Sequence, residues 1–467
     1  MSVSRFPALM SPTGLALLSV LLSPLAFGAV PFNAWVPLAW LWIFLGGVSL
    51  LEQRKNRLPL HSHPLAGIAA TLLALHALLL VQLIPLPPSV LEVLSPGSYA
   101  VNYVPPSARV AWAPLTASPT GTSQAWLFFA GLNGLALALH NPSSLSRSRV
   151  MTLLFSGMAL IGTVLALAGL LQAASAHPFW LYGLFEVPGV GSHERGIFGP
   201  YYNRDHYSNL IAIAASVAAG LLARRIPRNA SRLSLEAVTS PDFPATLALV
   251  AALVIMFVAS AASGSRGGLA AIGIGVLTGL ASPFLARPRL ALGSALLLAL
   301  VLFGTGVPSA VSRMADVDFE QSRLSVWRDT LRLFEFYPVF GCGIGAFAPA
   351  YWPYQRVVRF EYWPHVHNEY LQWGLEAGAV GILMAVFWLR AGWRAAPRIV
   401  RSHEIRPALA GLLAALTHAT VEGSFRIPAN AAWAALLLVC VVVPDRTPAA
   451  GTEGSSSLDE RLPARNS

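Results

Sequence analysis

The sequence predicts an all-α polytopic membrane protein with about 12 transmembrane helices and a large periplasmic loop. Of the 467 residues, 55% are hydrophobic and only 11% are charged, and the mean hydropathy is +0.60. A soluble domain carries roughly 25% charged residues, so a soluble fold of this size would lack the polar surface that it needs. The apolar residues also gather in long runs, which short arginine-containing segments separate. A lipid bilayer is therefore the solvent that this composition fits.

Twelve segments are apolar enough to be interpreted as membrane spans, since a crossing takes roughly 20 apolar residues. They lie near 8–30, 33–51, 65–86, 123–140, 150–176, 207–222, 245–262, 267–285, 290–306, 369–391, 407–422 and 427–445. The first two are alternatively a re-entrant pair, because Pro24 and Pro31 lie near their junction. The N-terminus also resembles a signal peptide with Ala26-Phe27-Gly28 as a weak cleavage site. We favour a first membrane helix because further spans follow at once.

The distribution of Lys and Arg predicts that both ends of the chain are cytoplasmic. Cytoplasmic loops carry an excess of these residues. With the N-terminus inside, twenty Lys and Arg residues fall on the cytoplasmic side and eleven on the other side. Six of those eleven lie in the long segment 307–368, and long segments cross a membrane largely regardless of their charge.

The chain is expected to divide into three parts. Residues 1–176 form N-terminal membrane helices, and 177–445 form a membrane core that includes the periplasmic loop 307–368. Residues 446–467 form a disordered cytoplasmic tail, because they are polar and poor in aromatic residues. An amphipathic helix is expected near 321–336.

A second outer segment, 87–122, is rich in Pro and Ser and is expected to be irregular covering structure. The net charge of +10 comes almost entirely from Arg in short loops, which indicates membrane topology and argues against a nucleic-acid partner. Cys342 falls in a loop and Cys440 in an apolar run, so we expect no disulfide between them.

Four polar segments lie on the outer face in this topology. They are Glu194–Tyr207, Ser263–Gly268, Arg323–Arg328 with Gly341–Gly345, and His365–Gly378. An Arg guanidinium grips phosphate with two hydrogen bonds and keeps its charge, so several Arg residues at one place suit a diphosphate. A His side chain takes a proton from a hydroxyl near neutral pH. Together they indicate glycosyl transfer from a lipid diphosphate donor, in which Arg stabilises the departing diphosphate.

These motifs resemble the O-antigen ligase and O-antigen polymerase superfamily of bacterial envelope enzymes. The resemblance rests on the order SGSRGG, then Arg-x-x-x-Trp with Gly-x-Gly-x-Gly, then HNEYLQ-x-x-x-E-x-G, with FGPYYNRDHYSNL before a span. It covers roughly residues 190–390. It implies a C-type glycosyltransferase-like helical fold in the bacterial inner membrane, with an active site that faces the periplasm. It also implies an inverting transfer without a metal or other cofactor, a polyprenyl-diphosphate-linked glycan donor, and a glycan or lipid A-core acceptor.

The resemblance also implies roles for individual residues. Arg266 matches the Arg of the short turn, Arg323 matches the Arg before the Trp, and His367 matches the His that is proposed as the base. We expect these three to be catalytic. We expect a second group to bind substrate: Arg195, Asn203, Asn368, Gln372 and Glu376.

Several of these assignments have alternatives. His365 is a rival for the role of base. The two histidines also suggest a metal pair, although no third ligand is evident. Arg323 is alternatively a surface residue beside Glu320 and Asp329, and Glu376 alternatively pairs with an Arg, because a carboxylate inside a span is costly.

The function has alternatives as well. A polysaccharide transporter or flippase would place its polar residues near the midplane on broken helices in paired halves. A scaffold without catalysis is a third possibility. Within the enzyme class, a ligase and a polymerase differ in their acceptor, and the sequence leaves that choice open because the shared motifs handle the donor.

Overall fold

The computed structural model describes residues 10–57, 65, 68–103, 111–141, 145–178, 180–186, 196–225, 241–285, 317–355 and 363–443. The predicted span near 290–306, the candidate Arg195 and the predicted tail 446–467 lie outside these residues.

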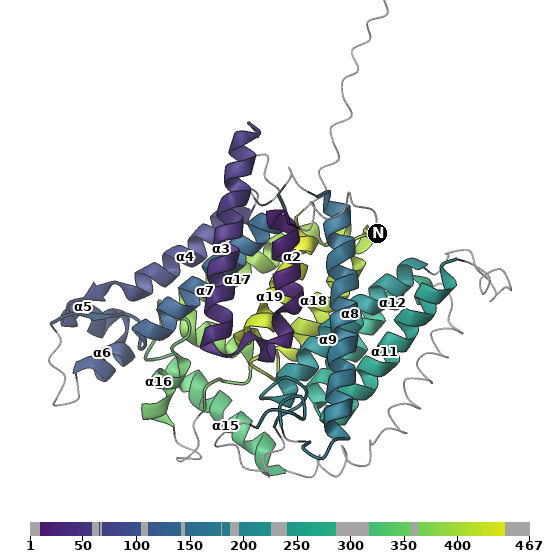
Figure 1. Cartoon of the computed structure of the whole chain (residues 1–467). Helices are drawn as coiled ribbons and strands as arrows, with labels where there is room; N and C mark the ends of the chain where they lie inside the picture. Colours follow the sequence, from purple (N-terminus) through teal and green to yellow (C-terminus); the bar gives the residue numbers. More distant parts are fainter. Residues whose placement is uncertain are drawn as a thin grey trace, which may run out of the picture.

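Within the described residues, helices occupy the other eleven predicted spans (Figure 1). They are α2 (Pro12–Leu22), α3 (Phe32–Lys55), α4 (Ala69–Leu83), α7 (Pro119–Leu139), α8 (Arg147–Ala173), α9 (Arg204–Arg225), α11 (Phe243–Ser263), α12 (Arg266–Leu285), α17 (Glu369–Arg401), α18 (Arg406–His418) and α19 (Pro428–Val442).

Six of the helices in the described part of the chain are long and apolar enough to cross a membrane: α3, α7, α8, α9, α11 and the first part of α17. Four shorter apolar helices accompany them: Pro12–Leu25, Ala69–Leu83, Arg266–Leu280 and Pro428–Val442. The protein is therefore an all-α membrane protein at this level of description. The total of about 12 spans and the large periplasmic loop remain predictions.

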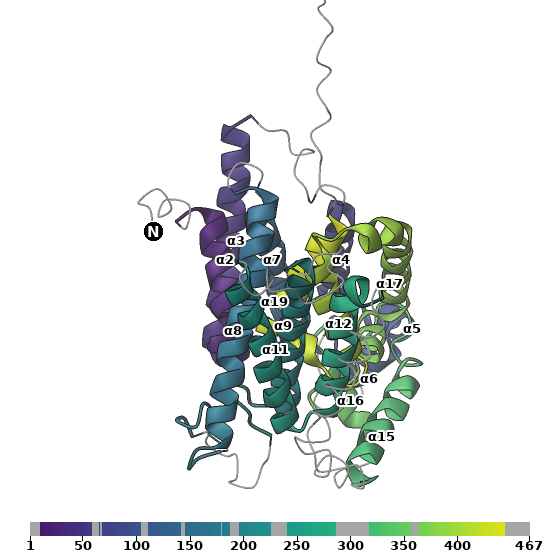
Figure 2. The same ribbon diagram turned by 90° about the vertical axis from the view of Figure 1, so that its right-hand side faces the viewer.

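Helix α9 lies at the centre of the bundle. It contacts α8, α11, α12 and α18, and both views show it surrounded by these helices (Figures 1 and 2). Almost all of its residues are buried, including its polar Ser208, Asn209 and Ser216. A helix that is covered on every side packs closely only where side chains are small, and α9 is accordingly rich in Ala.

Glycines bring α12 into close contact with α9. A methyl group at Gly268 would overlap the side chain of Ser208, and one at Gly275 would overlap Ser216. Close packing of small residues is a main source of helix association in membranes, where the hydrophobic effect between helices is absent. This contact fixes the start of α12 beside the start of α9, where the candidate site lies.

The first two predicted spans form an N-terminal helical hairpin. Helix α2 ends in two short 3-10 turns, η2 (Ser23–Leu25) and η3 (Phe27–Ala29), and α3 then returns beside it (Figure 1). The turn lies between the two prolines that the sequence analysis noted, and α2 spans only 11 residues.

Short elements cover one end of the bundle, which we call the site end: the end at which α9, α12 and α17 begin and α18 ends. Strand β1 (Pro85–Leu86) pairs antiparallel with β2 (Ala113–Pro114), and α5 (Pro88–Leu94) and α6 (Pro96–Tyr103) lie between them in the chain. The expectation that 87–122 is irregular was therefore wrong in part. Its prolines begin helices at the first turn, where a missing N–H costs nothing.

Helix α15 (Val317–Leu333) is the predicted amphipathic helix and also lies at the site end, followed by α16 (Phe347–Tyr351) and η6 (Trp352–Tyr354). Buried residues from these segments form a small separate core that includes Val326, Tyr337 and Phe347. This core holds α15 against the start of α17.

Helix α17 is broken at Gly378, whose φ of 61° and ψ of −158° are not helical. The segment after α15 fills the break, because Ala379 N donates to Pro338 O at 3.0 Å and Val380 N donates to Val339 O at 3.1 Å. The buried Gln82 of α4 donates to the carbonyls of Phe340 and Glu376 at 2.7 and 2.8 Å, respectively. The first turns of α17 are thereby aimed independently of the rest of the helix.

Candidate active site

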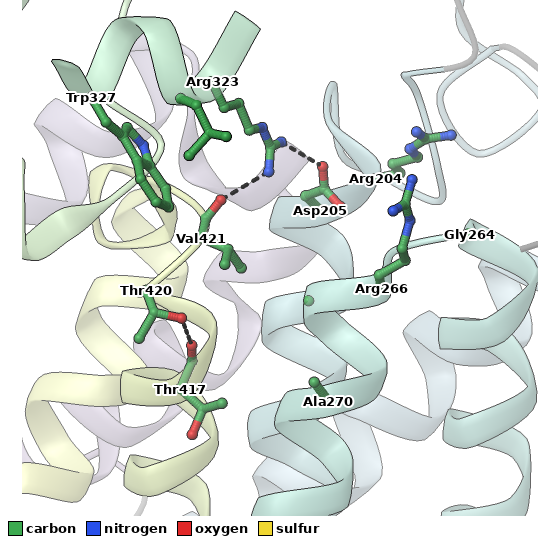
Figure 3. Close-up of a pocket in the computed structure, with 12 residues that line it drawn as sticks. Arg204, Asp205, Gly264, Arg266, Ala270, Arg323, Trp327, Thr417, Thr420 and Val421 are labelled. Atoms are coloured by element: carbon green, nitrogen blue, oxygen red, sulfur yellow. Dashed lines mark hydrogen bonds and ion pairs between the residues drawn. The ribbon is translucent and has the colours of Figure 1, made fainter. Parts of the chain in front are cut away.

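A cavity of about 480 Å³ opens at the site end, between the starts of α9 and α12, the end of α18, and α15 (Figure 3). It is lined by Arg204, Asp205, Gly264, Arg266, Gly267, Ala270, Arg323, Leu324, Trp327, Thr417, Thr420 and Val421. Three predicted segments that are far apart in the sequence therefore meet here and contribute three arginines to one cavity.

The turn SGSRGG places Arg266 at the first residue of α12. Gly264 ends α11 in the left-handed conformation, with φ of 73°, which glycine adopts without strain. The Ser265 side chain then accepts a hydrogen bond from Gly268 N at 3.2 Å and caps the new helix. The exposed Arg266 side chain therefore stands at a helix N-terminus, which itself favours anions.

Helix α9 begins in a similar way. The Asn203 side chain accepts a hydrogen bond from Asp205 N at 2.7 Å, so it caps the helix. Arg204 follows directly and lines the cavity, and Figure 3 shows its side chain and that of Arg266 at the same edge of the cavity. Among the described residues, no carboxylate forms an ion pair with Arg204.

Arg323 enters the cavity from α15 and is held by three acceptors. Its guanidinium donates to Val421 O at 2.9 Å and to the Glu422 carboxylate at 2.8 Å, and it lies 3.4 Å from the Asp205 carboxylate. Its side chain is 17% exposed. The alternative of a surface residue beside Glu320 and Asp329 is therefore wrong, because Arg323 points into the bundle and Asp329 pairs with Arg332 at 3.5 Å.

His367 is paired with Glu422. Its Nδ1 lies 2.5 Å from Glu422 Oε1, and Glu422 is 1% exposed. Burial alone would raise the pKa of Glu422, but the neighbouring His206, His367 and Arg323 outweigh burial and hold the pKa well below its ordinary value. Glu422 is therefore a carboxylate that only accepts hydrogen bonds, so in the neutral imidazole of His367 the proton is on Nδ1 and the lone pair is on Nε2. This is the arrangement of a histidine base that a buried carboxylate orients.

His365 differs from His367 in its surroundings. Burial lowers the pKa of His365 to about 3, helped by the charge of Arg426 and by the nearby His206 and His367. A group with so low a pKa holds a proton weakly, so it is a poor base near neutral pH. Of the two histidines that the sequence left open, the geometry favours His367.

A second buried network lies beside this pair. Arg426 donates to Glu376 at 2.7 Å and to Glu369 at 3.3 Å, and Gln372 donates to Glu376 at 3.0 Å. The alternative that Glu376 pairs with an Arg is therefore correct. Gln372 and Glu376 are 1% and 0% exposed, so their contacts are within the protein.

Asn368 accepts hydrogen bonds from Tyr370 N and Leu371 N, both at 3.0 Å, and so caps α17. These contacts give Asn203, Asn368, Gln372 and Glu376 positioning roles in this structure. Their direct contact with substrate stays a prediction, as does that of Arg195.

A comparison with protein families identifies the segment that holds these motifs. Residues 251–386 match the family described as O-antigen ligase. Over this segment the chain is similar to the O-antigen ligase and polymerase superfamily, so the resemblance seen in the motifs is confirmed there. None of the curated proteins compared with the chain matches it.

The O-antigen ligase segment contains Arg266, Arg323 and His367, and the match supports an O-antigen ligase or polymerase type of activity. Four further site residues lie outside the segment: Arg204, His206, Glu422 and Arg426. The helices before and after the O-antigen ligase segment thus complete its site.

Sequence reasoning missed these four residues for different reasons. Arg204 and His206 stood in a quoted motif, but Arg195 was preferred as the phosphate ligand. Glu422 was placed at the end of a predicted span, whereas α18 ends at His418 and Glu422 lies in the turn that follows. The available signal was an acid and an Arg within five residues of each other between two apolar runs, since charges at membrane depth are costly and usually paired.

Proposed function

We propose that the protein transfers a glycan from a polyprenyl-diphosphate-linked donor to an acceptor hydroxyl at the periplasmic face of the bacterial inner membrane. The observation that carries the proposal is the cavity with three arginines beside the His367–Glu422 pair. Arg323 joins the two parts, because it lines the cavity and binds the same carboxylate that holds His367.

The cavity suits the diphosphate of the donor. Small-molecule sites commonly have volumes of roughly 300–1,000 Å³, and this cavity of about 480 Å³ falls within that range. Arg204 and Arg266 lie at one edge of it, and the N-terminus of α12 adds partial positive charge there. Arg323 is largely neutralised by Glu422 and Asp205, so we assign it mainly to positioning that carboxylate.

The reaction then requires one base. His367 Nε2 takes the proton of the acceptor hydroxyl, and the hydroxyl oxygen attacks C1 of the donor sugar from the side opposite the diphosphate. The new C1–O bond forms as the bond from C1 to the phosphate oxygen breaks. The electron pair leaves with the polyprenyl diphosphate, and the configuration at C1 inverts. Arginine charge stabilises the leaving group, a task for which other enzymes use a divalent cation.

A polymerase of the same family is the nearest alternative, because it uses the same donor and differs only in its acceptor. Neighbouring genes discriminate between the two. A gene cluster with its own flippase and chain-length regulator favours a polymerase, whereas a lone gene near lipopolysaccharide-core genes favours a ligase. A transporter is less well supported, because the charged residues gather at one end of the bundle and not at its middle.

The test separates donor binding from transfer. Full-length protein in liposomes is given the polyprenyl-linked glycans extracted from its host, and binding is measured in parallel with inorganic pyrophosphate and farnesyl diphosphate. Arg266→Lys keeps the charge but loses the planar guanidinium that donates two hydrogen bonds to one phosphate. This variant should lose most binding and most transfer. His367→Ala should keep binding while transfer falls by roughly 10²–10⁴-fold.

Arg328→Ala is the matched control, because Arg328 lies on α15 near the site with an exposed side chain and forms no ion pair among the described residues. It should behave as the wild type. A correctly inserted His367→Ala protein that transfers at the wild-type rate would end the assignment of the base. Wild-type protein that binds neither diphosphate would end the proposed function.

A further inference from the structure

Two histidines approach the same oxygen of Glu422. His367 Nδ1 lies 2.5 Å from Oε1, and His206 Nε2 lies 3.6 Å from the same atom. Gly423 N also donates to Oε1, at 3.0 Å, while Arg323 occupies Oε2. A carboxylate oxygen offers about two lone-pair sites, so His367 and Gly423 already fill those of Oε1. His206 therefore lies just outside hydrogen-bond distance of an acceptor that is fully used.

The position of His206 is fixed by the bundle. The buried Asn430 of α19 donates to the carbonyl of His206 at 2.8 Å and to Asn209 at 3.0 Å, and it accepts a hydrogen bond from Tyr201 at 2.9 Å. The His206 side chain is 12% exposed, and its buried Nε2 has no hydrogen-bond partner among the described residues. A buried nitrogen without a partner is uncommon and calls for an explanation.

We propose that His206 is a positioning residue that competes with His367 for the Glu422 carboxylate and so sets the pH above which His367 acts as a base. This inference rests on the proposed function. It concerns the control of the base and not the identity of the substrate.

The physical reason is the balance of charge around Glu422. A protonated His367 is stabilised by the negative charge of Glu422, and too strong a stabilisation would keep the proton on His367 after each transfer. A second histidine on the same oxygen weakens that hold, by competing for the lone pair and, when protonated, by repelling the other imidazolium. Other titratable or charged groups also face this carboxylate or its histidines: Asp205 of α9, Arg323 of α15, His365 before α17, His418 of α18 and Arg426 of η7 (Ser424–Arg426).

The direction of the effect follows from this competition. Removal of His206 leaves His367 as the one described imidazole within 4 Å of the Glu422 carboxylate, so His367 should hold its proton to a higher pH. A base works only when it is unprotonated. In a plot of transfer rate against pH, the acid limb, where the rate rises with pH, should therefore move to higher pH. We expect His206→Phe to move the acid limb to higher pH by about one unit. At a fixed pH on the acid limb, this shift corresponds to a loss of rate of about tenfold. His206→Gln keeps a neutral donor near the same place and should move the limb by less than half as much.

The experiment measures initial transfer rates of the full-length protein in liposomes from about pH 5 to pH 9 with the same host glycans. His177→Phe is the control, because His177 is exposed and stacks on Trp180 in another segment, and it should leave the limb in place. A residue that only fills space would, when replaced, lower the rate equally at every pH.

The outcomes separate the two proposals. Wild-type protein that shows no transfer at any pH refutes the proposed function. Wild-type protein that transfers, combined with a wild-type acid limb in an inserted His206→Phe protein, refutes only the role of His206. If His206→Phe does not insert, His206→Leu decides, because its side chain also lacks a donor: an upward shift supports the role, and an unchanged limb overturns it.

Discussion

Replacement of Glu422 by Gln should be the most damaging single change at the site that keeps side-chain volume. Glu422 accepts hydrogen bonds from Arg323 at 2.8 Å and from His367 at 2.5 Å, and both partners are charged or become charged. A Gln side chain offers one oxygen and one NH₂ group, so one of the two partners would face a donor in place of an acceptor. The variant therefore breaks one contact whichever way its amide turns.

The magnitude follows from burial. Loss of one partner from a buried ion pair costs roughly 3–5 kcal/mol. Because Gln keeps one of the two contacts and Arg323 is 17% exposed, we expect the lower end, about 3 kcal/mol. Transfer should fall by roughly 10²–10⁴-fold, since His367 loses the group that fixes its tautomer and stabilises its charged form.

The effect on stability should depend on pH. The pKa of Glu422 is lowered in the folded protein, so its stabilising contribution is complete above the pKa of an unfolded Glu, about 4.3. That contribution is lost as the pH falls through the lower folded value. The part of the free energy of unfolding that comes from the ionisation of Glu422 itself should thus be constant above about pH 5 and shrink below that.

Thermal unfolding of the detergent-purified protein and glycan transfer in liposomes check these two effects. Glu92→Gln is the matched control, because Glu92 is an exposed carboxylate on α5 at the same end of the bundle. A Glu422→Gln protein with the stability and transfer rate of the control would refute the view that Glu422 links Arg323 to His367.

Two further predictions concern orientation and metals. Reporter fusions near Ser118 and Asp318 should report the periplasm, and fusions at Arg228 and Arg398 the cytoplasm; a cytoplasmic signal near Asp318 would remove the site from the face where we propose that the donor is presented. Purified protein in a chelator should keep its transfer activity, because arginine supplies the positive charge; complete loss that a divalent ion restores would return His365 and His367 to consideration as metal ligands.

The helices were predictable because each one depends mainly on local composition. The predicted spans 207–222 and 245–262 match α9 and α11 to within three residues at each end. The turn between α11 and α12 was equally readable, since Gly and Ser end and begin helices for local reasons. Three arginines at one end of the bundle followed from counting charges across the spans.

The partners of these residues were not predictable, because they come from distant parts of the chain. Arg323 meets a carboxylate 99 positions away, and His367 meets the same group 55 positions away. Nothing in the neighbourhood of either residue indicates which acid it binds. The shape of the site likewise depends on α9 and α12 approaching within the reach of a Ser side chain, which packing decides.

The glycines after α15 show the same limit, and they lead to a last prediction. The sequence analysis used Gly341–Gly345 only as a motif, whereas the structure shows this segment filling the break of α17 at Gly378. With φ of 61° and ψ of −158°, Gly378 adopts a conformation that only glycine populates, and a Cβ there would lie 2.5 Å from Val339 O.

Gly378→Ala should therefore lower the free energy of unfolding by about 3 kcal/mol or more, the sum of backbone strain of roughly 1–3 kcal/mol and the overlap with Val339. Gly392→Ala is the matched control on the same helix, because a Cβ at Gly392 meets nothing within 4 Å. It should be neutral or slightly stabilising, since Ala is the better helix former by up to about 1 kcal/mol.

Because the break sets the direction of the first turns of α17, Gly378→Ala should also reduce transfer more than farnesyl diphosphate binding, which depends on α9 and α12. A Gly378→Ala protein as stable and active as Gly392→Ala would show that the break is not needed to place His367.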